Sequence, residues 1–255
     1  MDGDTRMTYA ELDRRANGIA QRLRDGGTGH EDVVAVAIPR SADLIATQLG
    51  VLKAGAAFLP VDLDHPDDRV AYLLTDSRAR VVITTAADVM RLPLVDDVSY
   101  LVTDDVTPVT TGPSVVTTGD HPAYLMYTSG TTGRPKGVLI THHALLNQLT
   151  WVIDHFGLRG DDRMLHQYSP GFDPHVEEVF APLLAGAAIV VARPGGHTDP
   201  AYLTGLVRDE RVTVMDLVPT LLRALLDHTD SDTAPWWGSL RRLLAGGEAL
   251  TPELA

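Results

Sequence analysis

Cysteine is absent from this 255-residue sequence, and lysine is scarce, with Lys53 and Lys136 as the two lysines among 21 basic residues. The absence of cysteine excludes disulfide scaffolds, thiolate metal sites and cysteine nucleophiles. Acidic residues number 34, which gives a formal net charge of −13. This balance argues against a nucleic-acid binder, since neutralising phosphates requires clustered lysine and arginine. Each lysine is therefore a candidate for a specific role.

Long apolar segments are missing as well. The longest, residues 180–192, is interrupted by Pro182 and Gly186 and is too short to span a bilayer. Residues 1–6 are not followed by an apolar stretch, so the start of the sequence does not have the pattern of a secretory signal. The length is enough to bury a core as one large domain or two modest ones. We expect a cytoplasmic protein that binds neither membranes nor nucleic acids.

Two apolar spacings alternate along the chain. Thr8 and Glu11 have the spacing of a capping box, and helically spaced apolar residues follow until Gly26. Residues 33–38 are apolar without alternation, as in a strand covered on both faces. Further strands are predicted at residues 57–60, 80–84, 98–103, 123–127, 138–140, 164–168, 188–192, 212–216 and 242–245, and further helices at 43–54, 66–75, 143–156, 174–184, 200–210 and 219–228. This order predicts an α/β fold with mostly parallel sheets and helices on both faces.

Residues 104–120 interrupt this alternation. They are rich in threonine, valine, proline, glycine and aspartate, and they have no helical period. Such a composition is typical of a surface connection. We therefore predict two α/β lobes, formed by residues 1–115 and residues 116–255.

The most informative segment is Tyr127-Thr-Ser-Gly-Thr-Thr-Gly-Arg-Pro-Lys-Gly137. Its glycines let backbone N–H groups turn toward a ligand, and its hydroxyls and Lys136 supply further donors, so an anion such as a nucleotide phosphate is the expected occupant. It is not a Walker A loop, because Pro135 precedes the lysine and Gly137 follows it. Composition alone favours the alternative, a polar loop between two strands, by about two to one.

The ordered motif resembles a known family. Residues 123–137 closely resemble the phosphate-binding signature of the adenylate-forming enzymes, and more specifically that of the adenylation domains of nonribosomal peptide synthetases. Residues 7–12, 52–62, 172–173 and 244–250 resemble other motifs of this family, in the family's order. The resemblance covers nearly the whole chain and implies the large N-terminal subdomain of the adenylate-forming fold.

The resemblance implies amino-acid activation. With ATP and Mg²⁺, the substrate carboxylate attacks the α-phosphorus, pyrophosphate leaves, and the aminoacyl group then passes to the phosphopantetheine thiol of a peptidyl carrier protein. Such chemistry needs positioning and charge stabilisation at phosphate oxygens. The residues that the resemblance assigns to ATP are Thr128, Ser129, Gly130, Thr131, Thr132, Gly133 and Lys136 in the loop, and Gly246, Gly247 and Glu248 near the adenine. We interpret Lys53 as structural.

Acidic residues mark the expected amino-acid pocket. Helix capping is the ordinary role of an acid such as Asp173, by about three to one, but the resemblance implies that it pairs with the α-ammonium of the substrate. Asp216 lies at the carboxyl end of a predicted strand, where open α/β sheets bind ligands, although an Asx-type turn is equally compatible. The substrate-binding residues carried over by register are Phe172, Asp173, Pro174, Glu177, Asp216, Leu244 and Gly246.

Three carboxylates in one pocket predict a cationic substrate. Asp173, Glu177 and Asp216 would be brought together, and the α-ammonium neutralises one of them. The others are costly to bury unless the substrate side chain is also cationic. We therefore expect a basic amino acid: ornithine, lysine, arginine or a cyclic guanidino analogue. On a helical wheel, Glu178 points away from the apolar stripe of its helix, and we expect His175 to be packed or solvent-facing.

Several family motifs have no counterpart in these 255 residues. They include the adenine motif with the acid that holds Mg²⁺, the ribose-binding aspartate, and the C-terminal subdomain with its adenylation lysine; a helix and strand before residue 7 are also missing. We therefore expect a partial subdomain without a metal site of its own, weakly active or inactive unless joined by the missing C-terminal part. The alternatives are a natural split domain that acts as a binding or interaction module, and an acyl-CoA-type ligase, which Asp173 disfavours.

Overall fold

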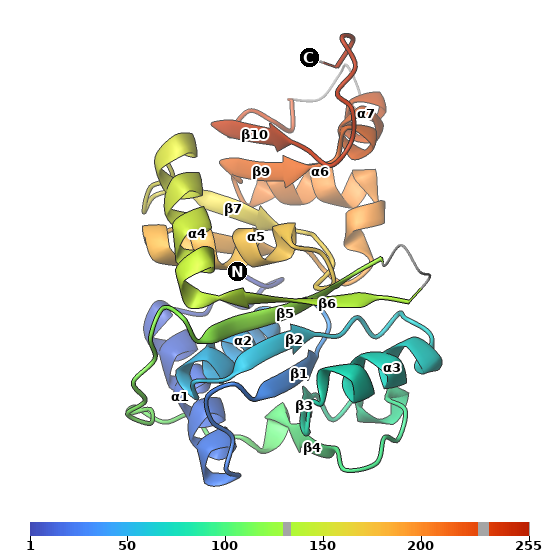
Figure 1. Cartoon of the computed structure of the whole chain (residues 1–255). Helices are drawn as coiled ribbons and strands as arrows, with labels where there is room; N and C mark the ends of the chain where they lie inside the picture. Colours follow the sequence, from blue (N-terminus) through green and yellow to red (C-terminus); the bar gives the residue numbers. More distant parts are fainter. Residues whose placement is uncertain (130–133, 229–234, 255) are drawn as a thin grey trace. The chain divides into compact units, whose positions relative to one another are not determined.

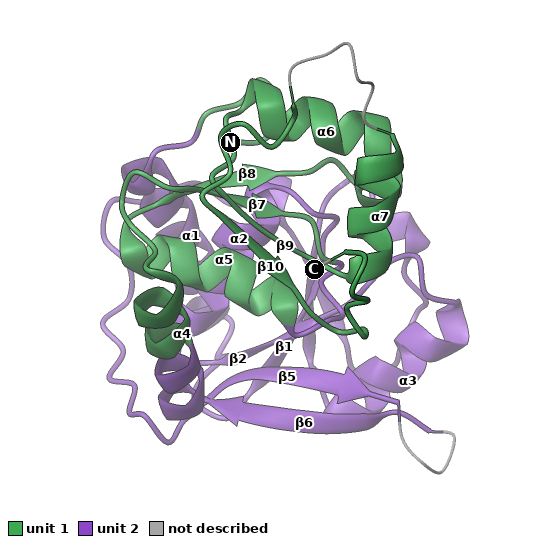
Figure 2. Ribbon diagram, turned by 90° about the horizontal axis from the view of Figure 1, so that it is seen from above, with its two compact units in different colours: residues 1–6, 149–168, 174–255 green, residues 7–148, 169–173 purple. Residues whose placement is uncertain are grey.

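The structure is a computed structural model that describes residues 1–129, 134–228 and 235–254. Its contacts divide the chain into two compact units (Figure 2). Unit 1 comprises residues 1–6, 149–168 and 174–255, and unit 2 comprises residues 7–148 and 169–173.

Unit 2 contains a six-stranded sheet in the order β4-β3-β1-β2-β5-β6 (Figure 1). All neighbouring strands are parallel except β5 and β6, which are antiparallel. The strands are β1 (Val33–Ala37), β2 (Ala57–Pro60), β3 (Val81–Thr84), β4 (Ser99–Val102), β5 (Pro122–Thr128) and β6 (Lys136–Thr141). The helices are α1 (Tyr9–Asp25), α2 (Ala42–Lys53), α3 (Asp67–Ser77) and the first half of α4 (His142–Phe156).

The central strands of unit 2 are buried because they are apolar without alternation. Every residue of β2 is buried, as are four of the five residues of β1. Helix α3 packs through Val70 and Leu74 on the sheet face of Ala35 and Ala37. The predicted capping box begins α1: the Thr8 side chain accepts the Glu11 N–H, and the Glu11 side chain accepts the Thr8 N–H.

Unit 1 contains a four-stranded parallel sheet in the order β10-β9-β7-β8. Its strands are β7 (Arg163–His166), β8 (Ala188–Val191), β9 (Val214–Leu217) and β10 (Arg242–Ala245), and its helices are α5 (Pro174–Ala185), α6 (Pro200–Asp209), α7 (Pro219–Asp227) and the second half of α4. The chain start lies beside β8: the Met1 ammonium donates to the Ile189 carbonyl at 2.7 Å, and the Val191 N–H donates to the Met1 carbonyl at 2.7 Å.

The α/β prediction is confirmed, and every predicted helix and strand is present with its ends shifted by no more than two residues. Three short 3₁₀ helices, η1 (Val89–Arg91), η2 (Thr103–Asp105) and η3 (Gly196–Thr198), were not predicted, because three residues are too few to display a period. No helix within the described residues is long and apolar enough to cross a membrane.

The units differ from the lobes predicted at residues 1–115 and 116–255. Strand β5 pairs with β2, so residues 104–120 connect β4 and β5 of one sheet. Residues 123–126, an apolar run, are buried in that sheet. The composition of residues 104–120 marked a connection correctly, but it carries no information about which sheet receives the next strand.

Gly50 provides a test of the packing between α1 and α2. A Cβ on Gly50 would lie 2.7 Å from Ile19 and 2.9 Å from the Ala16 carbonyl. We expect Gly50→Ala to lower the free energy of unfolding by about 1–3 kcal/mol through overpacking. Gly205→Ala in α6 is the control: its Cβ has no neighbour closer than 4.0 Å, so it should gain about 0.5–1 kcal/mol. Urea denaturation measures both, and equal effects would contradict this packing.

Candidate functional site

The predicted phosphate loop extends from the antiparallel β5–β6 hairpin. Thr128 ends β5 and Lys136 begins β6, and the two residues are register partners. The Thr128 hydroxyl donates to the Lys136 carbonyl at 3.5 Å. The side chains of Thr128, Ser129 and Lys136 are exposed. Four other predicted loop residues, Gly130, Thr131, Thr132 and Gly133, lie outside the described residues.

Helix α3 supports the base of this hairpin through two tyrosines. The Tyr72 hydroxyl donates to the Pro135 carbonyl at 3.0 Å, and the Tyr127 hydroxyl donates to the Asp76 carboxylate at 2.7 Å. Burial raises the pKa of Tyr127, and its bond to Asp76 raises that pKa further. Exposed hydroxyls and an ammonium group on a fixed strand pair can bind an anion.

Phe172 and Asp173 belong to unit 2, in the segment that precedes α5. The Ser169 hydroxyl donates to the Asp62 carboxylate, and the Phe172 N–H donates to the Ser169 carbonyl at 3.1 Å. Both predicted residues are exposed, Phe172 by 63% of its surface. Burial raises the pKa of Tyr124 in β5, and the charge of Asp173 raises it further. Asp173 therefore offers its carboxylate to solvent beside this strand.

The other predicted substrate residues belong to unit 1. Asp216 in β9 and Leu244 in β10 are register partners, so their side chains share one face of the sheet. The Gly246 N–H donates to the Leu217 carbonyl at 3.1 Å and extends the ladder by one bond. Pro174 is the first residue of α5, and Glu177, one turn further along, is half-buried.

Electrostatics links Glu177 to Asp216. Burial, followed by the negative charges of Glu178 and Glu177, raises the pKa of the Asp216 carboxyl to about 7. Glu177 and Glu178 are thus close enough to Asp216, near the carboxyl end of β9, for their charges to act on its carboxyl group. A cation placed among them would relieve both the repulsion and the cost of burial.

The helical wheel predicted that Glu178 points away from the apolar stripe of its helix, but the structure buries this residue. It is 0% exposed. Its carboxylate accepts the backbone N–H groups of Gln167 and Tyr168 at 2.8 and 3.0 Å, and it lies 2.9 Å from the His166 imidazole. Helix α5 is buried on more than its apolar stripe, since His175 is also 0% exposed. A helical wheel considers the helix alone. It therefore does not reveal that the N–H groups of Gln167 and Tyr168, at the end of β7, provide partners for a buried Glu178.

The turn after β10 holds the remaining predicted residues. Gly247 has a φ of 79°, a conformation that glycine adopts without strain. The Glu248 carboxylate accepts the N–H of Thr220 at 3.1 Å and also its hydroxyl. Glu248 therefore satisfies free donors at the start of α7, while Gly246 and Gly247 are exposed beside it.

Lys53 contacts α1. Its ammonium group donates to Asp13 at 2.6 Å and to Asn17 at 2.8 Å. These bonds join the end of α2 to α1, as a structural lysine would. Within the described residues, no group of three or more histidine, aspartate or glutamate side chains could hold a metal ion.

Comparison with known proteins gives one family over the whole chain. A family model described as AMP-binding enzyme matches residues 1–255. Tyrocidine synthase 3 of Brevibacillus parabrevis is 39% identical over 97% of this chain and 4% of the synthase. The nonribosomal peptide synthetase FmoA3, solved with α-methyl-L-serine-AMP, is 34% identical with a TM-score of 0.94 over 100% of this chain and 28% of that one. The N-terminal subdomain of NpsA from Klebsiella oxytoca is 27% identical with a TM-score of 0.86, over 98% of this chain and 64% of that one.

Asp216 makes stability depend on pH. Its pKa is about 7 in the folded chain against an ordinary value of 3.8, so the folded chain binds a proton that the unfolded chain has released. The contribution of Asp216 to the stability of the wild type should therefore fall as the pH rises from about 4 to about 7. Asp216→Asn removes this loss, and its Tm should exceed that of the wild type by more at pH 8 than at pH 4. Asp209→Asn, at an exposed site, is the control; a pH-independent offset for Asp216→Asn would contradict the assignment.

Proposed function

The chain belongs to the AMP-binding enzyme family, and from this premise we propose that it is part of an amino-acid adenylating enzyme of a nonribosomal peptide synthetase. The likeness to tyrocidine synthase 3 and to an aminoacyl-AMP-bound synthetase supports this proposal. The chain spans 4% and 28% of these two proteins. We propose that the longer synthetase also carries out the steps that follow adenylation. They include transfer of the aminoacyl group to the phosphopantetheine thiol of a carrier protein, in the cytoplasm.

The chain's own contribution to ATP binding is the β5–β6 hairpin. The exposed hydroxyls of Thr128 and Ser129 and the ammonium of Lys136 would donate to phosphate oxygens. Charge stabilisation of this kind favours the departure of pyrophosphate once the substrate carboxylate attacks the α-phosphorus. Mg²⁺ would neutralise phosphate charge when bound; the described residues include no group of three or more histidine, aspartate or glutamate side chains that could hold it.

The substrate that we propose is a basic amino acid. The half-buried carboxyl of Asp216 carries this proposal: burial raises its pKa, and the charges of Glu178 and Glu177 raise it further. A cationic side chain would bind between Glu177 and Asp216 and favour the ionised form of Asp216. Asp173, whose carboxylate is exposed in unit 2, is the residue that we propose for an α-ammonium group.

Substrate choice is tested by pyrophosphate exchange on the complete synthetase. Ornithine, lysine and arginine should exceed leucine and phenylalanine, and the KM for the preferred basic amino acid should fall as the pH rises through about 7, where Asp216 ionises. Asp216→Asn should raise that KM about tenfold, the effect of about 1.4 kcal/mol, while Asp209→Asn leaves it unchanged. Preference for a neutral or aromatic amino acid would refute the proposed substrate.

The 255-residue chain by itself should show weak or no adenylation. Of its lysines, Lys53 is engaged with Asp13 and Asn17, and Lys136 lies at the hairpin, so neither is assigned to the substrate carboxylate. Hydroxamate trapping of the aminoacyl adenylate measures this activity, with circular dichroism as the control for folding. ATP-dependent adenylate formation at the rate of the complete synthetase would refute this expectation.

A further inference from the structure

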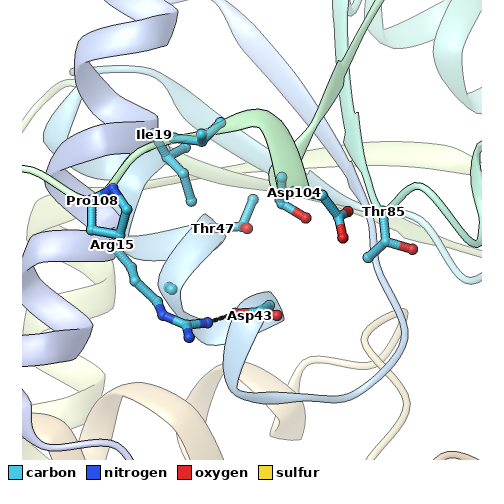
Figure 3. Close-up of a pocket in the computed structure, with 10 residues that line it drawn as sticks. Arg15, Ile19, Asp43, Thr47, Thr85, Asp104 and Pro108 are labelled. Carbon is cyan, nitrogen blue, oxygen red and sulfur yellow. Dashed lines mark hydrogen bonds and ion pairs between the residues drawn. The ribbon is translucent and has the colours of Figure 1, made fainter.

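A cavity of about 330 Å³ lies within unit 2, apart from every residue assigned above to ATP or to the amino acid (Figure 3). It is lined by α1, α2 and the residues that follow β3 and β4, among them Thr85 and Thr103. In the order β4-β3-β1-β2, the chain leaves β1 toward β2 on one side and later adds β3 on the other. The cavity therefore lies at the carboxyl ends of strands beside a topological switch point, where open α/β sheets bind ligands.

One lining hydroxyl lacks a partner. Thr47 of α2 is 0% exposed, and its Oγ1 has no hydrogen-bond partner among the residues that the structure describes. Thr47 nevertheless lines the cavity, in the middle of the group drawn in Figure 3. Buried hydroxyls are almost always hydrogen-bonded, because an unmade bond costs the full desolvation of the group. A polar ligand in the cavity would supply this bond.

The charged residues of the lining decide what kind of ligand fits. Arg15 forms an ion pair with Asp43, so these two charges offset each other. Asp104 accepts the Ala86 N–H at 2.9 Å and has no cationic partner among the described residues. The Thr85 hydroxyl donates to the Asp88 carboxylate at 2.7 Å and accepts the Asp88 N–H at 3.2 Å. The lining thus carries a net negative charge from Asp104, and Ile19 adds an apolar wall.

We propose that this cavity binds a small organic ammonium compound. Asp104 is the counterion of its ammonium group, the Thr47 hydroxyl makes a hydrogen bond to it, and Ile19 contacts its carbon chain. The cavity is of the size that such compounds occupy in proteins, at the lower end of the range for ligand pockets. This site is separate from the proposed adenylation site, because none of its lining residues is a predicted site residue.

Ethanolamine is the probe for this site. Added to the 255-residue chain at constant ionic strength, it should raise the Tm saturably, whereas acetate and glycerol, an anion and a neutral polyol, should not. Asp104→Asn should weaken the response at least tenfold, and the neighbouring Asp105→Asn, outside the lining, should leave it unchanged. No saturable shift up to about 10 mM, or an equal shift with glycerol, would overturn the proposal.

Thr47→Val separates a ligand contact from a structural one. It keeps the shape of the side chain and removes the hydroxyl, so without probe the variant should be at least as stable as the wild type, while its affinity for ethanolamine should fall several-fold. A loss of stability with unchanged affinity would show that the hydroxyl is bonded within the chain, and would overturn the role given to Thr47 in binding.

Discussion

The buried carboxylate of Glu178 is the contact on which the geometry of unit 1 depends. It accepts the N–H groups of Gln167 and Tyr168 and thereby holds α5 at the end of β7. The Gln167 side chain donates in turn to the carbonyl of Asp216 at 2.5 Å, so the same end of β7 also positions β9. Without Glu178, buried N–H groups would be left unpaired, at about 1–3 kcal/mol each.

The same carboxylate also shapes the electrostatics of this unit. Its negative charge, together with burial and the charge of Glu177, raises the pKa of Asp216. A group that anchors a helix therefore also sets how strongly its neighbour attracts protons and cations. Packing and electrostatics are coupled here, since a change at Glu178 alters both the contacts of α5 and the pKa of Asp216.

In unit 2, the carboxyl edge of the parallel strands carries both polar regions. The connection between β5 and β6 begins after Thr128, the last residue of β5. The cavity is lined by Thr85 and Thr103, which follow β3 and β4. The carboxyl ends of parallel strands lie at one edge of the sheet, and the loops that follow them can carry function without disturbing the buried strands. Charge separates the two regions: the hairpin presents Lys136, while the cavity presents Asp104.

The sequence by itself determined the helices and strands, the capping box of α1 and the hairpin position of the glycine-rich loop, because periodicity and capping act over a few neighbouring residues. It also identified Asp216 as a polar residue at a strand end. Only the tertiary structure decided that β5 and β6 join the sheet of β1, and that Glu178 is buried against the end of β7. It also brought Thr47 to the cavity wall and Glu178 near Asp216. Such contacts join residues distant in sequence, and their energies come from desolvation and charge, which local spacing does not encode.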